Sequence, residues 1–193
     1  MEEIIASEKR LKEGKSTDDG WTKRMLTSIS VLLYPLLLII FNNILRFSHF
    51  PNSWRDAVVN TLYKNKGVTW LPQYFRPISL VQLLTKMFDF VLLERFRQWF
   101  KPHDCQSAYQ SGKSCADHVF LLRALIDYCI KTDTKLFLIC IDFEGAFDKV
   151  SRHRLFRKLY MFGCGTVFLS CLMAIYSSTP CTIFQTEGSF TYY

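Results

Sequence analysis

The stretch that decides the fold runs from Lys135 to Asp148 and reads KLFLICIDFEGAFD. Its first part, Lys135 to Ile141, is a continuous apolar run of strand length, which predicts a strand buried in a sheet. The run ends on Asp142, and a carboxylate there costs free energy unless a partner uses it. A hard divalent cation is the usual partner. Spacing alone leaves a surface or helix-capping role open, and Asp148 could cap the next helix.

The rest of the chain predicts a mixed α+β fold of helices and short strands. Helical periodicity covers Trp21 to about Phe47, where Pro35 should kink or divide the helix. Further helices are expected at residues 80–100, 115–131, 151–162 and 166–177. A strand is expected at 57–63, a basic turn at 64–67 and an extended stretch at 73–80. A loop is expected at 105–114 and a hairpin at 180–193, whose second strand stops mid-course. Residues 1–20 are polar and are expected to be frayed or loosely helical.

Composition excludes several classes of protein. Of the 193 residues, 49% are hydrophobic and 16% aromatic, which argues against intrinsic disorder, and 8 Gly and 6 Pro argue against collagen-like or low-complexity sequence. The net charge of +7 is uneven, because residues 21–100 carry ten basic and three acidic side chains. Such a basic half suits a nucleic-acid enzyme, although +7 is also an ordinary charge for solubility.

Cysteine usage and the N-terminus indicate an intracellular protein that is not secreted, located in the nucleus or the cytoplasm. The 7 Cys are odd in number and follow no disulfide framework, so we expect reduced, largely buried thiols. The N-terminal residues are charged throughout and do not resemble a signal peptide. The most apolar run, Ile29 to Phe41, contains Pro35 and is shorter than the roughly 20 residues of a membrane span. We therefore expect a buried helix and no membrane partner, with a short membrane-associated helix as the minor alternative.

Beyond spacing, the order of motifs resembles the reverse transcriptases of non-LTR, LINE-type retrotransposons. The resemblance covers roughly residues 9–193. It rests on LKEGKSTDDGW (11–21), FPNSWRDAVVNTLYKNKG (50–67), FRPISL (75–80), CQSAYQSGKSCADHVFLLRAL (105–125), IDFEGAFDKVSRHRL (141–155) and the later KLYMFGCG and FLSCLMAIYSS. It implies a partial right-hand polymerase fold, with a polar segment at 1–20, a fingers-like region at 21–134 and an incomplete palm at 135–193.

The resemblance also assigns roles to individual residues. Asp142 matches the aspartate that binds the catalytic Mg²⁺ ions, and the backbone carbonyl of Phe143 matches a second metal ligand. Phe147 matches the aromatic residue that packs under the nucleotide sugar and excludes a 2′-hydroxyl, although on sequence grounds it could be a core residue. Arg76 and Lys64 match the cations that hold the incoming triphosphate, with a solvated turn as the alternative for Lys64. The implied partners are an RNA template, a DNA primer and deoxynucleoside triphosphates.

Two departures from the family pattern bear on activity. Gln110 stands where the family carries a cation on the template path. No Asp-Asp pair follows Asp142, whereas the family supplies its second set of metal ligands from an Ala-Asp-Asp hairpin, and Glu187 is the sole carboxylate after Asp148. Because two-metal nucleotidyl transfer needs both sets, we expect this chain alone to be inactive. A non-catalytic nucleic-acid or protein interaction module and a non-functional relic are the alternatives.

A second metal site is a weaker possibility in the sequence. His103, Cys105, Cys115 and His118 offer four ligands that zinc could use, but their spacing fits no common zinc finger. Cys105 and Cys115 also flank a motif that the polymerase resemblance already explains.

Overall fold

The structure is a computed structural model that describes residues 1–14, 20–147, 149–177, 181–185 and 188–192, and in the last two segments it describes the backbone alone. The chain divides into two compact units, residues 1–98 with 151–193 and residues 99–150. The elements are mixed α and β, as predicted. The domain boundaries at 20/21 and 134/135 stay a prediction, because these units group residues by spatial contact and not by functional subdomain.

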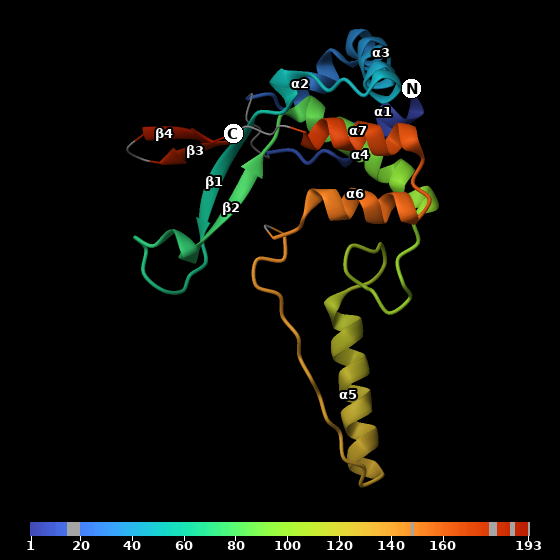
Figure 1. Ribbon diagram of the computed structural model, residues 1–193, viewed down its shortest axis with the longest axis vertical. Coiled ribbons are helices and arrows are strands. Elements are labelled where there is room, and N and C mark those ends of the chain that lie inside the picture. Colours follow the sequence, from blue (N-terminus) through green and yellow to red (C-terminus); the bar gives the residue numbers. More distant parts are fainter. Residues whose placement is uncertain (15–19, 148, 178–180, 186–187, 193) are drawn as a thin grey trace. The chain divides into compact units, whose positions relative to one another are not determined.

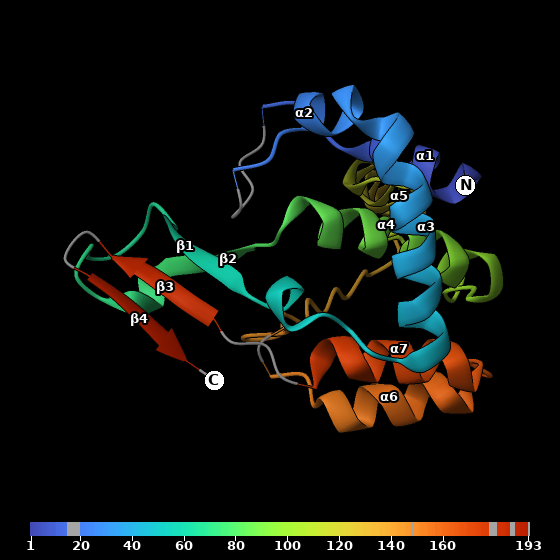
Figure 2. The ribbon, with the colours of Figure 1, turned by 90° about the horizontal axis from the view of Figure 1, so that it is seen from above.

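The first unit holds a four-stranded sheet and most of the helices. Its helices are α1 (Glu2–Arg10), α2 (Lys23–Ser28), α3 (Ser30–Phe47), α4 (Leu83–Trp99), α6 (Arg152–Met161) and α7 (Thr166–Tyr176), with short 3₁₀ turns η1 (Asn52–Trp54) and η2 (Pro72–Tyr74). Its strands are β1 (Ala57–Tyr63), β2 (Phe75–Leu80), β3 (Cys181–Gln185) and β4 (Gly188–Tyr192). Figure 1 labels these elements, and Figure 2 shows the strands from above.

The sheet has the order β2-β1-β3-β4. β1 pairs antiparallel with β2 and parallel with β3, and β3 and β4 form the predicted antiparallel hairpin. β2 carries Pro77, which has no N–H for a ladder, and it lies at the edge of the sheet where proline is tolerated. The strand prediction at 57–63 is confirmed, as is the extended stretch that ends at Leu80.

The core of this unit forms between helices. Leu37, Phe41, Met87 and Phe88 are buried together, with the rings of Phe41 and Phe88 4.9 Å apart. The same core takes residues from α1, α3, α4 and α7 and the segments beside them, namely Ile4, Leu11, Leu26, Ile44, Leu45, Phe50, Leu83, Val91, Leu92 and Cys171. Because these side chains are far apart in sequence, burying their apolar surface holds the helices against one another.

Helix α1 shows that residues 2–10 of the segment expected to be frayed or loosely helical form a regular helix, which packs on its neighbours. Its residue Glu8 is buried and accepts hydrogen bonds from the hydroxyls of Thr27 on α2 and Tyr34 on α3. Burial, with the Glu8 carboxylate as acceptor, raises the pKa of Tyr34 to about 12. A buried carboxylate is stable when donors satisfy it, so this network fixes three helices together.

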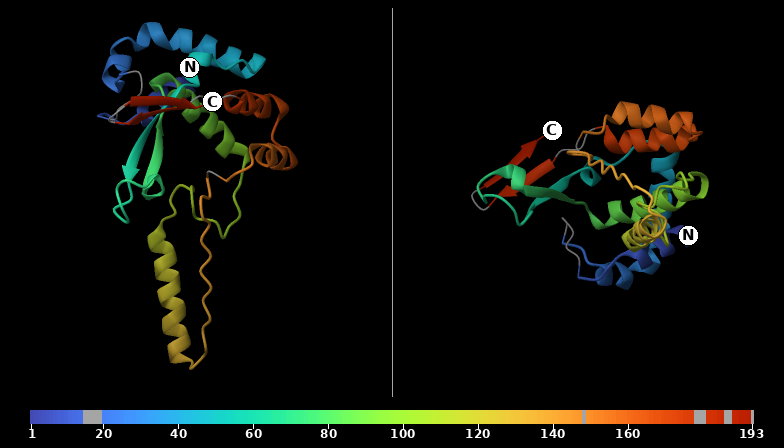
Figure 3. Two further views of the ribbon diagram at one scale, coloured as in Figure 1. Left: turned by 60° about the vertical axis from the view of Figure 1, so that its left-hand side comes forward. Right: turned by 90° about the horizontal axis from the view of Figure 1, so that it is seen from below.

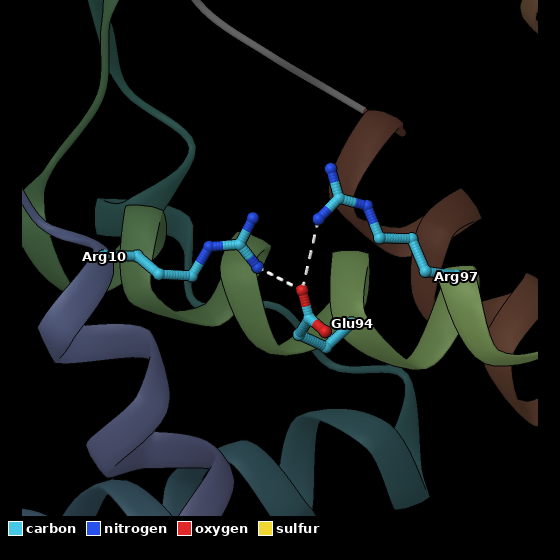
Figure 4. A network of polar contacts seen from close by, with 3 residues as sticks. All are labelled: Arg10, Glu94 and Arg97. Atoms are coloured by element: carbon cyan, nitrogen blue, oxygen red, sulfur yellow. Dashed lines mark hydrogen bonds and ion pairs between the residues drawn. The ribbon is translucent and has the colours of Figure 1, made fainter. Parts of the chain in front are cut away.

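Ion pairs attach α1 to α4 at the surface. Arg95 donates from Nε and Nη2 to the two carboxylate oxygens of Glu3, at 2.8 and 2.7 Å. Figure 4 shows Glu94 between two guanidinium groups, those of Arg10 on α1 and of Arg97, whose Nη1 lies 3.3 Å from the carboxylate. The two hydrogen bonds from the Arg95 guanidinium hold the pKa of Glu3 below its usual value. The pairs of Arg95 with Glu3 and of Arg10 with Glu94 join residues more than eighty positions apart, which a local pattern does not reveal.

The helical region at 21–47 divides at Ile29, and not at Pro35 as predicted. Ile29 ends α2 and precedes α3, whereas Pro35 lies within the continuous helix α3. A proline there removes the bond to the carbonyl of Val31. Val31 is 85% exposed, so water can reach this carbonyl. The predicted division at the proline is therefore wrong, while a kink there stays a prediction.

Helix α3 is also less buried than the sequence indicated. It buries one stripe, Leu37, Phe41, Ile44 and Leu45, and leaves other apolar side chains exposed, namely Val31, Leu32, Leu36, Ile39, Ile40 and Phe47. Among the described residues it is the one helix that has the length and composition to cross a membrane, and 22% of it is buried. Core helices of soluble proteins can meet the same criterion, so this property alone indicates no span.

The second unit contains α5 (Cys115–Lys131) and irregular segments on either side. The predicted helix has the same bounds, because Ser114 and Asp117 form a capping box in which the Asp117 carboxylate accepts the Ser114 N–H at 2.7 Å. After α5 the chain turns back and runs along the helix as an extended trace (Figures 1 and 3). The loop predicted at 105–114 is confirmed.

The predicted buried strand at Lys135–Ile141 does not form in the described structure. Residues 135–141 have no regular secondary structure, and Phe137 and Ile139 are 85% and 86% exposed. A strand requires a neighbouring strand to satisfy its backbone N–H and C=O groups, and within the described ranges β1 to β4 pair only with one another. The apolar pattern therefore indicated burial that this unit does not provide.

The cysteines are less buried than expected. Cys164 and Cys171 are buried, which raises the pKa of both thiols, that of Cys171 to about 11. Cys105, Cys115 and Cys140 are exposed, and none of the described cysteines forms a disulfide. The expectation of largely buried thiols is thus met at two positions, while the side chain of Cys181 lies outside the described residues.

Candidate nucleotide-binding site

The β1–β2 hairpin brings Lys64 and Arg76 to one face. Arg76 pairs with Leu62 across the antiparallel ladder, and Lys64 lies two residues beyond Leu62, with its N–H bonded to the carbonyl of Tyr74 at 2.8 Å. Opposed residues share a face of the sheet, and so do residues two apart along a strand. Lys64 follows the last residue of β1, and its bond to Tyr74 continues the ladder by one residue, so the two cations are diagonal neighbours.

The turn after β1 is held by hydrogen bonds on both sides. The Lys64 ammonium donates to the carbonyl of Gln73 at 2.7 Å, and the Tyr63 hydroxyl donates to the carbonyl of Gly67 at 2.6 Å. Gly67 has φ +78°, and a Cβ there would lie 2.3 Å from the Tyr74 ring. A glycine is therefore favoured at this position of the turn.

Arg76 has an exposed side chain, and within the described part of the chain it makes no hydrogen bond or ion pair. A free guanidinium on an edge strand can offer several N–H donors to one anion, in a planar arrangement that matches phosphate oxygens. Beside it, Lys64 supplies a point charge. The two side chains together offer a site for a polyanion of triphosphate type.

In the second unit, Asp142, Phe143 and Phe147 lie in one exposed loop. Both rings are 77% exposed, so neither is a core residue in the described structure. The ring of Phe147 stands edge-on to that of Tyr109, with centroids 6.4 Å apart and an interplanar angle of 89°. The sequence placed these aromatic residues in two separate motifs and did not predict that they touch.

The carboxylates of this loop do not form a metal cluster in the described residues. Glu144 pairs with Lys149 at 3.4 Å, and no three His, Cys, Asp or Glu side chains gather as metal ligands. Asp148 lies outside the described residues. The cap that the sequence allowed for Asp148 is supplied instead by Ser151, whose hydroxyl accepts the Arg154 N–H at 3.4 Å.

The four candidate zinc ligands are likewise not gathered in this part of the chain. Nδ1 of His103 accepts the backbone N–H of Cys105 at 3.2 Å, and Cys115 and His118 lie exposed on the first turn of α5. In the preceding loop, Gln110 donates to the carbonyl of Gln106, and the Lys113 ammonium donates to the carbonyl of Asp104 at 3.1 Å. Both hydrogen bonds join residues of this same loop.

Comparison with known proteins identifies the family. The family model for reverse transcriptase (RNA-dependent DNA polymerase) matches residues 63–192. This chain belongs to the reverse transcriptase family. The matched range contains Lys64, Arg76, Asp142, Phe143 and Phe147, so all the residues discussed above as nucleotide or metal ligands fall within the reverse transcriptase domain.

Curated relatives place the domain among non-LTR, LINE-type retrotransposons. It is 31% identical over 69% of its length to the transposon TX1 149 kDa protein of Xenopus laevis. It is 27% identical over 82% to the probable RNA-directed DNA polymerase from transposon BS of Drosophila melanogaster, and 26% over 73% to the Pol polyprotein of the type-2 element R2DM of the same species. The chain spans 10% to 18% of the length of these relatives.

Proposed function

We propose that this reverse transcriptase domain supplies the fingers and the first part of the palm of an RNA-directed DNA polymerase with a partial right-hand fold. The observation that carries the proposal is the shared face of Lys64 and Arg76 on the β1–β2 hairpin. In this role the two cations bind the triphosphate of an incoming deoxynucleotide, and the wider partners are an RNA template and a DNA primer. An intracellular location, in the nucleus or the cytoplasm, is part of the same proposal.

Positive charge close to the phosphates serves two purposes in nucleotidyl transfer. It binds the substrate, and it stabilises the negative charge that develops on the departing pyrophosphate. Arg76 suits the second purpose because its guanidinium can donate two hydrogen bonds to one phosphate. Lys64, which already donates to the Gln73 carbonyl, suits the binding role.

In the loop of the second unit, we assign Asp142 and the backbone carbonyl of Phe143 as ligands of Mg²⁺. Oxygen donors of these kinds fit a hard cation, but one carboxylate and one carbonyl form an incomplete set for two ions. Bound metal would activate the primer 3′-hydroxyl and neutralise the phosphates. Phe147, with Tyr109 against its edge, forms the wall that excludes a ribose 2′-hydroxyl.

The same reasoning leads us to propose that the chain does not polymerise by itself. After Asp148 the 193-residue sequence contains one further carboxylate, Glu187, and no Asp-Asp pair follows Asp142. The alternative function, a non-catalytic nucleic-acid module, is favoured by the ten basic and three acidic residues between 21 and 100. A relic without function would instead fail to bind nucleotide or nucleic acid.

Primer extension tests the catalytic part of the proposal. Purified protein is incubated with oligo(dT) annealed to poly(rA), dTTP and Mg²⁺, beside Asp142→Asn as the matched variant. We expect no extended product from either protein. Extension by the wild-type chain that Asp142→Asn abolishes would disprove the proposed inactivity, while supporting the assignment of Asp142.

A further inference from the structure

Helix α6 is the most basic element of the described structure that the proposed nucleotide site does not use. It reads RHRLFRKLYM from Arg152 to Met161, and it contains no Asp or Glu. Its N-terminal turn has no acidic residue, although a helix N-terminus favours negative charge. Basic side chains in that first turn oppose the helix dipole, whereas Lys158 in the last turn is favourable to it.

One face of α6 packs against α7, side by side with it in Figures 1 and 2. Phe156 and Leu159 are half-buried, and the Phe156 ring lies 6.3 Å from that of Tyr176 on α7. Arg152 belongs to the same face, because its guanidinium lies over the Tyr176 ring at 5.6 Å and donates to the Tyr176 carbonyl at 3.0 Å. This inner face is therefore occupied by structural contacts.

The outer face carries the remaining cations. Arg154, Arg157 and Lys158 are exposed, and Arg157 and Lys158 lie three and four residues after Arg154, a spacing that brings the Cβ atoms of each pair with Arg154 to about 5–6 Å. None of the three forms an ion pair within the described residues. Like charges at these spacings repel, by about 0.2–0.5 kcal/mol per pair in isolated helices. A bound polyanion would remove this repulsion.

Next to these cations an aromatic ring is open to solvent. Tyr160 is 61% exposed and lies three residues after Arg157 on the same side of the helix. A row of cations with an adjacent exposed ring can bind phosphates and stack a base, which is how proteins hold single-stranded nucleic acid without sequence preference. An anionic membrane surface would attract the same charges, but surface-bound helices turn a continuous apolar face to the lipid, whereas Phe156 and Leu159 of α6 are half-buried and leave only Leu155 and Met161 as exposed aliphatic side chains.

We infer that the outer face of α6, formed by Arg154, Arg157, Lys158 and Tyr160, binds the backbone of single-stranded RNA. The choice of RNA as the polyanion rests on the proposed function, whereas the presence of the site rests on the charges and exposure of α6. It is a second nucleic-acid contact, separate from the proposed triphosphate site on the β1–β2 hairpin.

Fluorescence anisotropy with labelled poly(U) tests this inference. The variant replaces Arg154, Arg157 and Lys158 by Gln, whose helix propensity is close to that of Arg and Lys, and circular dichroism checks that the helical signal is kept. The matched control replaces three exposed cations elsewhere, Arg123, Lys131 and Lys135, and so removes the same net charge. Titrations are run over a series of salt concentrations.

We expect the α6 variant to bind poly(U) at least about 10-fold more weakly at low salt, and its log–log salt slope to fall by about 2, since each single-strand phosphate contact contributes about 0.7. The control should keep most of the wild-type slope. Tyr160→Ala should weaken binding about 10-fold through the lost stacking. Equal affinity and slope in the α6 variant and the control would overturn the inference.

Two further measurements distinguish an RNA site on α6 from a membrane contact and from the proposed nucleotide site. If the α6 variant keeps poly(U) binding but loses binding to phosphatidylserine vesicles, the site is a membrane contact and the inference is wrong. Arg76→Gln should weaken dTTP binding and leave the α6 contact to poly(U) intact. If Arg76→Gln binds dTTP as tightly as the wild type while the α6 variant loses poly(U) binding, the proposed nucleotide site is wrong and the α6 inference stands.

Discussion

Lys64 and Arg76 lie on the same face of the β1–β2 hairpin, because Arg76 pairs with Leu62 and Lys64 follows Leu62 by two residues. A shift of the register by one residue would move Arg76 to the opposite face. The ladder therefore does more than hold two strands together, since it decides whether the two cations can act on one ligand. The turn that joins the strands is the natural place to perturb it.

Substitution of Gly67 should destabilise this turn. In Gly67→Ala the new Cβ would lie 2.3 Å from the Tyr74 ring, in addition to the strain of φ +78°. Gly163→Ala is the matched control, because Gly163 has φ +86° and a Cβ added there would meet no atom within 4 Å. We expect urea unfolding to show an extra loss of about 1–3 kcal/mol for Gly67→Ala over the control, from overpacking. Equal losses would mean that the Tyr74 ring moves away freely.

The Asp89 carboxyl should make stability depend on pH. It borders a cavity of about 330 Å³ between α4 and α7 whose other walls are apolar or aromatic: Leu92, Leu93, Phe96, Phe168, Leu172, Ile175 and Tyr176. One side of Asp89 remains open to solvent, but crowding by these side chains raises its pKa from 3.8 to about 6. Between pH 3.8 and about pH 6, the Asp89 carboxyl is therefore mostly protonated in the folded protein and mostly ionised in the unfolded chain.

It follows that the contribution of Asp89 to stability is most favourable below about pH 4, falls as the pH rises to about 6, and is constant above that. Asp89→Asn should remove this dependence. We expect the variant to melt at a higher temperature than the wild type at pH 7.5, and at nearly the same temperature at pH 4. The difference in melting temperature between Asp89→Asn and the wild type should thus be larger at pH 7.5 than at pH 4. An equal difference at the two pH values would contradict the raised pKa of Asp89.

The role of Phe147 can be measured by nucleotide binding without catalysis. dUTP and UTP differ only in the 2′-hydroxyl, so the ratio of their dissociation constants isolates exclusion of that group. Phe147→Ala should tighten UTP binding and change dUTP binding little, because the ring that would clash with the added oxygen is gone. Tyr109→Ala should shift the ratio in the same direction to a smaller extent, as Tyr109 contacts the edge of that ring. An unchanged ratio in Phe147→Ala would assign Phe147 to packing alone.

Elements with strong local signals could be predicted to within a residue or two. β1 and α5 match their predicted bounds, since the first ends in a turn of Lys, Asn and Gly and the second begins at a capping box. α1 could not be predicted as a packed helix, because its position depends on Glu3 with Arg95 and on Glu8 with Thr27 and Tyr34. These contacts join residues that no local window contains.

The apolar run at 135–141 shows the opposite error. Its composition predicted burial, but burial of a strand also requires hydrogen-bonding neighbours, and sequence hydrophobicity carries no information on whether they are present.

The candidate site was predicted residue by residue from motif resemblance. Its geometry was not, since the shared face of Lys64 and Arg76 depends on strand register, and the contact of Phe147 with Tyr109 depends on the path of two loops.

Binding of dTTP in the presence of Mg²⁺ tests the central claim most directly. Isothermal titration would compare the wild type with Arg76→Gln and Lys64→Gln, and with Arg24→Gln, an exposed cation of α2 outside the site, as the matched control. Since hydrogen bonds to charged groups contribute about 1.5–3 kcal/mol, we expect Arg76→Gln to weaken dTTP binding about 10- to 100-fold, Lys64→Gln to weaken it less, and Arg24→Gln to leave it unchanged. Wild-type affinity in Arg76→Gln and Lys64→Gln would contradict the proposed triphosphate site.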